Sequence, residues 1–184
     1  SSVQVKIGVS SDGKIIYAVG TDGMLKALDS EDGSLVGSSP LFEKTAFPIW
    51  VRFAAQGNVV AAAKDANRLE LVWQKYDPTD FGVAESGRAE KQGAKHMRDF
   101  ILNADGSQIA VCNAYVENGR ISKHSLDVYD TSSGALLSTA ERVNEMIPRA
   151  FSADNKSVFF DGGIHDPRLA QLHLKAKLET DFFP

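Results

Sequence analysis

The sequence is poor in cysteine, in basic charge and in long apolar runs, and each shortage excludes a class of protein. Cys112 is the single cysteine in 184 residues, so no intramolecular disulfide can form and packing must hold the fold together. A formal net charge of −4 offers no broad basic surface for nucleic acid or anionic membrane. The longest apolar runs, such as residues 59–63, are far shorter than the roughly 20 residues that a membrane-spanning helix needs. We therefore expect a folded globular chain that neither binds nucleic acid nor inserts into a membrane.

Motifs for metal binding and catalysis are missing as well. The four histidines do not form a His-x-x-x-His or His-Glu-x-x-His motif, and no cysteine cluster accompanies them. The sequence has no phosphate-binding loop that ends in Lys-Ser/Thr, no Gly-x-Ser-x-Gly elbow and no Asp-x-Asp-x-Asp calcium loop. A histidine lies near carboxylates in residues 161–167, where a polar turn is the favoured interpretation. The sequence therefore assigns no catalytic residue, no metal site and no cofactor.

Two features bear on the cellular compartment. Cys112 lies in an apolar, strand-like run, residues 107–113, where a small buried thiol is the ordinary interpretation. The chain begins at Ser1 rather than Met and shows no signal peptide, so we expect that an upstream segment has been removed. One cysteine does not fix the compartment, and the cytoplasm is slightly favoured over the periplasm or secretion.

The feature that the sequence does contain is a repeat. Four segments consist of an apolar run, a turn with Asp, Asn or Gly, and a second apolar run: residues 7–17, 51–60, 101–110 and 150–160. Each segment predicts a β-hairpin, because Gly or Asn can adopt the positive φ of a tight turn. The turn residues are Gly13, Gly57, Gly106 and Asn155, at steps of 44, 49 and 49 residues.

A third apolar run follows each hairpin. In the first three repeats this run ends in an acidic residue, Asp29, Asp77 or Asp130, and in the fourth the run is weaker. In the first and third repeats a second turn leads to a fourth run, residues 34–37 and 135–138. No segment has the three- and four-residue apolar spacing of a long helix. The sequence therefore predicts an all-β fold built from four-strand units of about 45 residues.

These repeats resemble the blades of the β-propeller superfamily, and WD-repeat and YVTN-type blades are the nearest kinds. The resemblance rests on Ser11-Asp12-Gly13, Ala104-Asp105-Gly106 and Ala153-Asp154-Asn155, and on Leu28-Asp29 and Tyr129-Asp130 where a WD-repeat blade has Trp-Asp. It implies one propeller domain or segment with four blades, at residues 3–39, 46–91, 95–142 and 147–183.

Three arrangements fit four such blades. They are a closed four-bladed ring, a half-ring that pairs with a second copy, and a part of a larger propeller. The last is favoured, because an open half-ring exposes blade faces and strand edges that a stable protein covers.

The resemblance implies a binding face made of the loops between strands two and three and between successive blades. In the third and fourth repeats the loop between strands two and three is long, residues 115–124 and 161–168, and long loops on a rigid scaffold often carry binding residues. An extended, solvated hairpin without a partner is the alternative. The candidate binding residues are Trp50, Arg52, His96, Arg98, Tyr115, Arg120, His124, Arg149, His165 and Arg168. For Trp50 a core position is the favoured interpretation, and Arg98 and Arg149 fit structural ion pairs as well as ligand contacts.

The resulting prediction is a non-enzymatic interaction module that binds a protein or peptide through its loop-rich face. The alternative is an enzyme or small-ligand binder, similar to the lactonase-like and quinone-dehydrogenase-like propellers, that acts at the central channel. A third interpretation is a structural part of a larger assembly that uses its open blade edges. The partners expected are a protein or peptide, with a second copy or missing blades completing the ring.

Overall fold

The structure, a computed structural model, describes residues 6–10, 12–20, 24–40, 48–54, 59–64, 70–76, 83–89, 95–161, 163–166 and 171–173. Regular structure within these residues is entirely β, which confirms the predicted fold class. The strands form antiparallel sheets of four strands each, and in every sheet the strands follow chain order. In the same residues there is no helix of the length and apolarity needed to cross a membrane.

We name the sheets A to D in chain order. Sheet A contains β1 (Lys6–Val9), β2 (Ile15–Val19), β3 (Met24–Asp29) and β4 (Leu35–Pro40). Sheet B contains β5 (Pro48–Phe53), β6 (Val59–Lys64), β7 (Glu70–Tyr76) and β8 (Val83–Ala89). Sheet C contains β9 (Lys95–Leu102), β10 (Gln108–Glu117), β11 (Arg120–Asp130) and β12 (Leu136–Arg142). Sheet D contains β13 (Pro148–Phe151), β14 (Val158–Phe160), β15 (Gly163–Asp166) and β16 (Gln171–His173). Each predicted hairpin is thus the first strand pair of a sheet.

Hydrogen bonds within the first turn explain the Asp-Gly motif of the repeat. In sheet A the Ser10 hydroxyl donates to Asp12 Oδ1 over 2.7 Å, and the same oxygen accepts the backbone N–H of Lys14 over 3.1 Å. Gly13 completes the turn with a φ of 73°, in the left-handed region that glycine adopts without strain. Equivalent contacts form the turn of sheet D through Ser152, Asp154 and Asn155. The motif is therefore a turn-forming device.

The acidic residue at the end of the third strand has a similar role. Asp29 Oδ1 accepts the backbone N–H of Glu31 over 2.7 Å, and Asp130 Oδ1 accepts that of Ser133 over 2.8 Å. The pKa of Asp130 lies below its usual value, chiefly because the Ser132 hydroxyl donates to its carboxylate. These carboxylates shape the turn that leads to the fourth strand. The third predicted member of this set, Asp77, lies outside the described residues.

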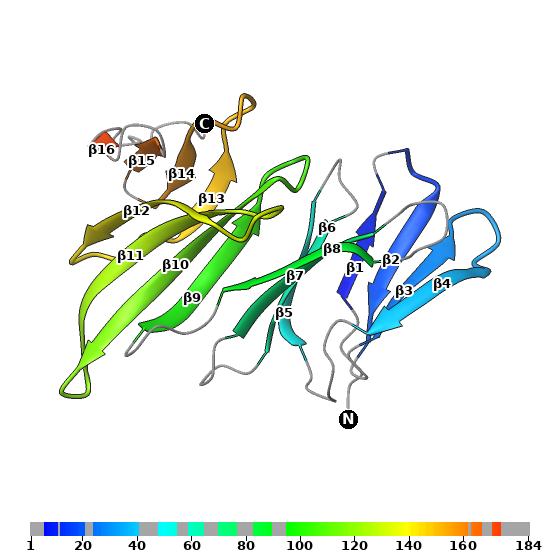
Figure 1. The fold of residues 1–184 in the computed structure, drawn as a ribbon, viewed down its shortest axis with the longest axis horizontal. Helices are drawn as coiled ribbons and strands as arrows, with labels where there is room; N and C mark the ends of the chain where they lie inside the picture. The colour runs from blue at the N-terminus through cyan, green and yellow to red at the C-terminus, as the bar shows by residue number, and fades with distance from the viewer. Residues whose placement is uncertain are drawn as a thin grey trace, which may run out of the picture.

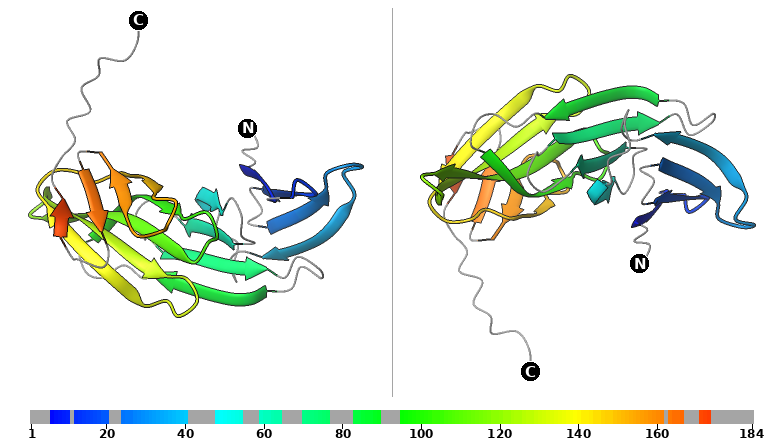
Figure 2. Two further views of the ribbon diagram at one scale, coloured as in Figure 1. Left: turned by 90° about the horizontal axis from the view of Figure 1, so that it is seen from above. Right: turned by 90° about the horizontal axis from the view of Figure 1, so that it is seen from below.

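The sheets stack face against face along an arc, with sheets A and D at its two ends (Figure 1). Contacts between successive sheets include those of β1 with β5, β5 with β9 and β9 with β13. Views from above and below place the first strands on the inside of the curve and the fourth strands on the outside (Figure 2). The described strands form an open arc and not a closed four-bladed ring.

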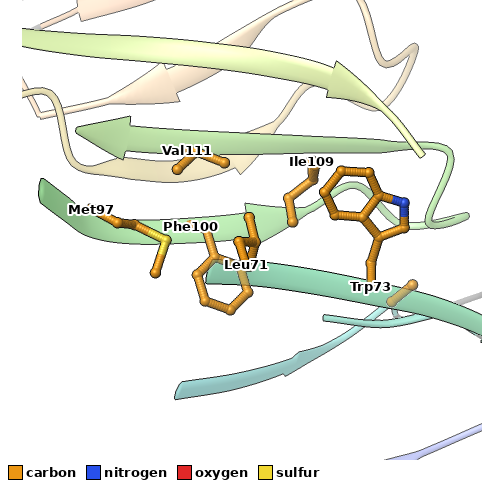
Figure 3. Close-up of a cluster of buried hydrophobic side chains, with 7 residues drawn as sticks. Leu71, Trp73, Met97, Phe100, Ile109 and Val111 are labelled. Atoms are coloured by element: carbon orange, nitrogen blue, oxygen red, sulfur yellow. The ribbon is translucent and has the colours of Figure 1, made fainter. Parts of the chain in front are cut away.

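The hydrophobic core lies between the sheets, in three clusters that are each shared by two neighbours. Their large members include Tyr17 and Tyr76 between A and B, Trp73 and Phe100 between B and C (Figure 3), and Leu126 and Phe160 between C and D. In β10, Ile109 belongs to the cluster with sheet B and the next residue, Ala110, to the cluster with sheet D. Successive side chains of a strand point to opposite faces, so both faces of sheet C are covered.

Candidate interaction site on the rim of sheet C

The long insertion in the third repeat is a β-hairpin. Strands β10 and β11 stay paired up to a two-residue turn at Asn118 and Gly119, whose φ angles are 52° and 74°. On either side, β9 pairs with β10 only as far as Tyr115, and β12 pairs with β11 only as far as His124. The tip of the hairpin therefore projects beyond its neighbours (Figure 1).

We use the name C rim for this hairpin, residues 115–123, together with the segment 143–147 that leads to sheet D. The two parts share one edge of the sheet, because Arg142 at the end of β12 pairs with His124 just below the hairpin. Two large apolar side chains are exposed here, Ile121 by 49% and Val143 by 78%. Arg120 is also exposed, and it has no ion-pair partner among the described residues.

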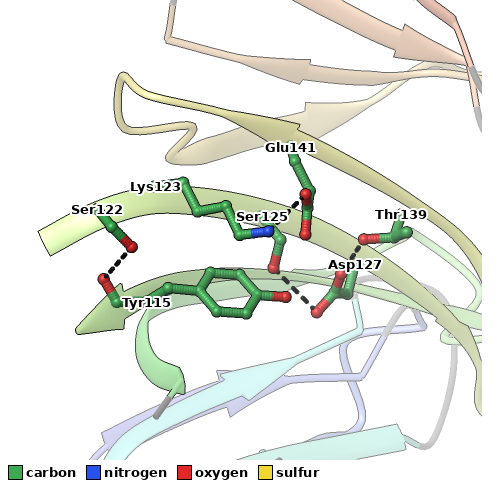
Figure 4. A network of polar contacts seen from close by, with 7 residues as sticks. All are labelled: Tyr115, Ser122, Lys123, Ser125, Asp127, Thr139 and Glu141. Atoms are coloured by element: carbon green, nitrogen blue, oxygen red, sulfur yellow. Dashed lines mark hydrogen bonds and ion pairs between the residues drawn. The ribbon is translucent and has the colours of Figure 1, made fainter. Parts of the chain in front are cut away.

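Side-chain contacts hold the hairpin in place (Figure 4). The Lys123 ammonium lies 2.8 Å from Glu141 Oε2 on β12 and 4.7 Å from the centre of the Tyr115 ring on β10. The hydrogen bond to Glu141 raises the pKa of Lys123. A cation over an aromatic face adds attraction to the ion pair. Three strands are thus linked through one side chain directly below the exposed tip.

A buried polar network lies beneath these contacts. Asp127 is fully buried, and its carboxylate accepts hydrogen bonds from Asn113 over 2.8 Å, from Ser125 over 3.2 Å and from Thr139. A buried carboxylate is tolerated when its oxygens are hydrogen-bonded in this way. No sequence motif marks these four residues. The sequence shows only single polar residues inside apolar strands. Their network could be predicted only with knowledge of the register that places β10, β11 and β12 side by side.

The two predicted histidines whose side chains the structure describes are buried. His124 Nδ1 lies 3.0 Å from the carbonyl oxygen of Val143, which ties the C rim to β11. His165 Nε2 lies 3.0 Å from the Ser138 hydroxyl, so its ring sits between sheets C and D. A partner cannot reach either ring without opening these contacts.

Three of the predicted arginines form ion pairs. The pairs are Arg52 with Asp99 (Nη2–Oδ1 3.2 Å), Arg98 with Glu145 (Nε–Oε1 2.9 Å) and Arg149 with Asp161 (Nε–Oδ1 2.8 Å). Arg98 and Arg149 thus have the ion-pair role that the sequence left open. The Arg149 guanidinium also lowers the pKa of Asp161. Exposed pairs of this kind contribute little to stability, and they neutralise charge that a free arginine would offer to a partner.

The remaining predicted residues fall outside the described side chains. Trp50 is in β5 and His96 in β9, but their side chains are not among those described. Arg168 lies wholly outside the described residues.

A groove of about 450 Å³ lies between the first strands of sheets A and B. Its lining is apolar apart from Arg52 and consists of Ile7, Gly8, Val9, Val51, Arg52, Phe53 and Ala54. No group of three or more His, Cys, Asp or Glu side chains in the described part of the chain is placed to hold a metal ion. Burial raises the pKa of the Cys112 thiol to about 11, which keeps it protonated at neutral pH.

Four-stranded meanders that stack along an arc, with their first strands inside, define the fold as that of a β-propeller. A similar solved structure is the β-propeller domain of Myceliophteria thermophila Cps50 (Swd1), with a TM-score of 0.56 and 14% sequence identity. The match covers 91% of this chain and 56% of that one, so this chain spans a little over half of that propeller's length. No protein-family model matches the sequence, and no curated protein matches it. At this identity the likeness shows the fold alone.

Proposed function

We propose that this chain is a non-enzymatic propeller module that binds a protein or peptide through the C rim. The observation that carries the proposal is the exposure of Arg120 and Ile121 next to the tip of a projecting hairpin, together with the exposure of Val143 in the segment that follows β12. Apolar side chains with an arginine are the residues that protein interfaces favour over the rest of a surface. Propellers host unrelated functions, so the support comes from this site and not from the fold.

The anchoring of the hairpin also supports a binding role. The contacts of Lys123 with Tyr115 and Glu141 hold the tip before a partner arrives. A preformed surface loses less conformational entropy on binding than a flexible loop does. The chemistry suits a peptide that presents an apolar side chain to Ile121 and a carboxylate to Arg120, because a guanidinium and a carboxylate can form two parallel hydrogen bonds.

The alternative of a small-ligand or catalytic site has weaker support. The groove between β1 and β5 is large enough for a small molecule, but its one charged lining residue, Arg52, is paired with Asp99. Catalysis of the usual kinds needs convergent acids, bases or nucleophiles in such a groove. The lining within the described residues supplies none of them.

Selection from a random peptide library tests the proposal. Peptides selected on the wild-type chain should bind the double variant Arg120→Glu, Ile121→Asp at least about tenfold more weakly, which corresponds to about 1.4 kcal/mol. Val36→Asp is the matched control, since Val36 is 43% exposed on sheet A, and it should leave the affinity unchanged. All three substituted side chains are exposed, so circular dichroism should show an intact fold. Equal affinity for the wild-type chain and the double variant would rule out the C rim as the binding surface.

A further inference from the structure

The interface between sheets A and B shows how successive sheets meet. Residues that pair across the strands of a sheet form a row, and all side chains of one row point to the same face. We call the row that faces the next sheet along the chain the forward row, and the row that faces the preceding sheet the backward row. The forward row of sheet A begins with Gly8 and Tyr17, which are cross-strand partners. They meet Phe53 in the backward row of sheet B: the rings of Tyr17 and Phe53 stack with centres 6.1 Å apart, and Gly8 lies directly against the Phe53 ring.

The next interface follows the same rule. The forward row of sheet B contains Arg52, its cross-strand partner Ala61, and Trp73, which pairs with Ala61 on the other side. The backward row of sheet C contains Leu102, Ile109 and Tyr129, which are cross-strand partners. The rings of Trp73 and Tyr129 lie 6.3 Å apart, so the two rows are again in contact.

Sheets C and D meet in this way too. The forward row of sheet C contains Ile101, Ala110, Val128 and Ser138, and the backward row of sheet D contains Phe151, Val158 and His165. Ser138 Oγ lies 3.0 Å from His165 Nε2, and the apolar members share one core cluster. A forward row therefore faces a backward row at each of the three interfaces.

The rows occupy fixed positions in the repeat. In every repeat the forward row contains the residue five positions before the turn residue and the residue four positions after it, as Gly8 and Tyr17 lie around Gly13. The backward row contains the residue four positions before the turn residue and the residue three positions after it. Sheet A also has a backward row, which contains Val9, Ile16, Leu28 and Leu35. Sheet D also has a forward row, which contains Ala150, Phe159 and Ile164. No described sheet covers either of these two rows.

On their first three strands both uncovered rows are apolar, and on the fourth strand the row of sheet D continues with His173. Val9 is 52% exposed, Leu35 60% and Phe159 41%. Contiguous apolar surface of this kind is unfavourable in water and marks an interaction site. One row is of the forward kind and the other of the backward kind, so the two are complementary. They cannot meet within one chain, because sheets A and D lie at opposite ends of the arc (Figure 1).

We propose that the two rows meet between two copies of this chain. The row of Ala150, Phe159 and Ile164 in one copy packs against the row of Val9, Ile16, Leu28 and Leu35 in the other. A two-fold axis makes both contacts at once and closes the ring, as expected for an isologous dimer. The match covers 56% of a similar propeller domain, so the arc corresponds to a little over half of such a ring. Eight sheets lie within the usual range for propellers. This surface is separate from the C rim.

The mass in solution is the first test. Light scattering should give about twice 19.9 kDa for the wild-type chain. Val9→Lys and Phe159→Lys should each give the mass of one chain, because each places a charge in the proposed contact. Val143→Lys, which substitutes an exposed apolar residue on the C rim, should remain dimeric. A wild-type mass of one chain at about 100 µM, a mass above that of a dimer, or unchanged dimers in both lysine variants would overturn the proposal.

A disulfide tests the pairing of the rows directly. Ala150 and Val9 hold the positions that Ile101 and Phe151 hold between sheets C and D, where both side chains pack against one core cluster. Ala150→Cys and Val9→Cys should therefore be close enough to cross-link between copies. A mixture of the two variants should form a disulfide-linked dimer under oxidation, and either variant alone should not. No cross-link in the mixture, or a cross-link with one variant alone, would exclude this pairing; the native Cys112 is buried and does not compete.

Discussion

The phenyl ring of Phe53 occupies the space in which a side chain at Gly8 would lie. A Cβ atom added to Gly8 would be 2.4 Å from Phe53 Cγ, much closer than two carbon atoms can approach. Gly8 is in β1 and Phe53 in β5, so the contact joins two sheets. The Tyr17 ring stacks on the same phenyl ring from the neighbouring strand. The close approach of sheets A and B thus depends on a residue without a side chain.

Gly8→Ala should therefore destabilise the protein, although alanine is usually the better residue in a strand. Overpacking of this kind costs about 1–3 kcal/mol of the free energy of unfolding, which urea titration measures. In the background of Phe53→Ala the same substitution should cost less, because the ring is gone. The two substitutions should differ from additivity by more than about 0.5 kcal/mol, the threshold for residues in contact. Additive effects would show that the ring moves aside freely.

Trp73 links sheets B and C by a hydrogen bond as well as by packing. Its indole Nε1 donates to the carbonyl oxygen of Thr131 over 2.8 Å, and the side chain is buried. Trp73→Phe should lower the free energy of unfolding by about 1–3 kcal/mol, because it removes the donor from a buried carbonyl and leaves a small cavity. Trp73→Leu should cost more, since it removes further contact area. A Phe variant as stable as the wild type would mean that water replaces the donor without loss.

The turns were predictable from the sequence because their chemistry is local. Asp12 and Gly13 form their turn through contacts within five residues, which a short window of sequence contains. The alternation of apolar residues likewise predicted the strands. The burial of His165 was not predictable, because its partner Ser138 lies 27 residues away in another sheet. The ion pairs of Arg98 and Arg149 were not predictable either, because the sequence does not show which strands and linkers lie side by side.

Asp127 should be the most sensitive polar residue of sheet C. Asp127→Ala leaves three donors, those of Asn113, Ser125 and Thr139, without their buried acceptor. Unsatisfied buried groups make such losses large, and we expect a fall of about 2–4 kcal/mol in the free energy of unfolding. Glu141→Ala is the control, because this carboxylate is exposed and should matter little for stability. Thermal unfolding of the two variants gives the comparison, and similar midpoints would contradict the assigned role of the network.

Stability should decline in acid because of the turn carboxylates. The pKa of Asp105 is lowered, first by the backbone N–H of Ser107 and then by its hydroxyl, and the pKa of Asp154 is lowered first by the Ser152 hydroxyl. A carboxyl whose pKa is lower in the folded state stabilises the protein above the unfolded-state pKa, and this contribution disappears as the pH falls through the folded-state pKa. The free energy of unfolding should thus fall as the pH drops below the unfolded-state pKa of about 4 and through the lower pKa values of the folded state.

Asp105→Asn isolates one part of this dependence. The asparagine oxygen can still accept the Ser107 N–H, so the turn should be retained while the titrating group is lost. The variant should show a shallower loss of stability with falling pH than the wild type. Asp154→Asn should change the slope in the same direction, and because the Asn155 amide donates to Asp105 Oδ2 over 3.3 Å, the two turns are in contact and their effects need not add. Urea unfolding at a series of pH values measures both slopes. A double variant with the wild-type slope would show that other carboxyl groups cause the acid sensitivity.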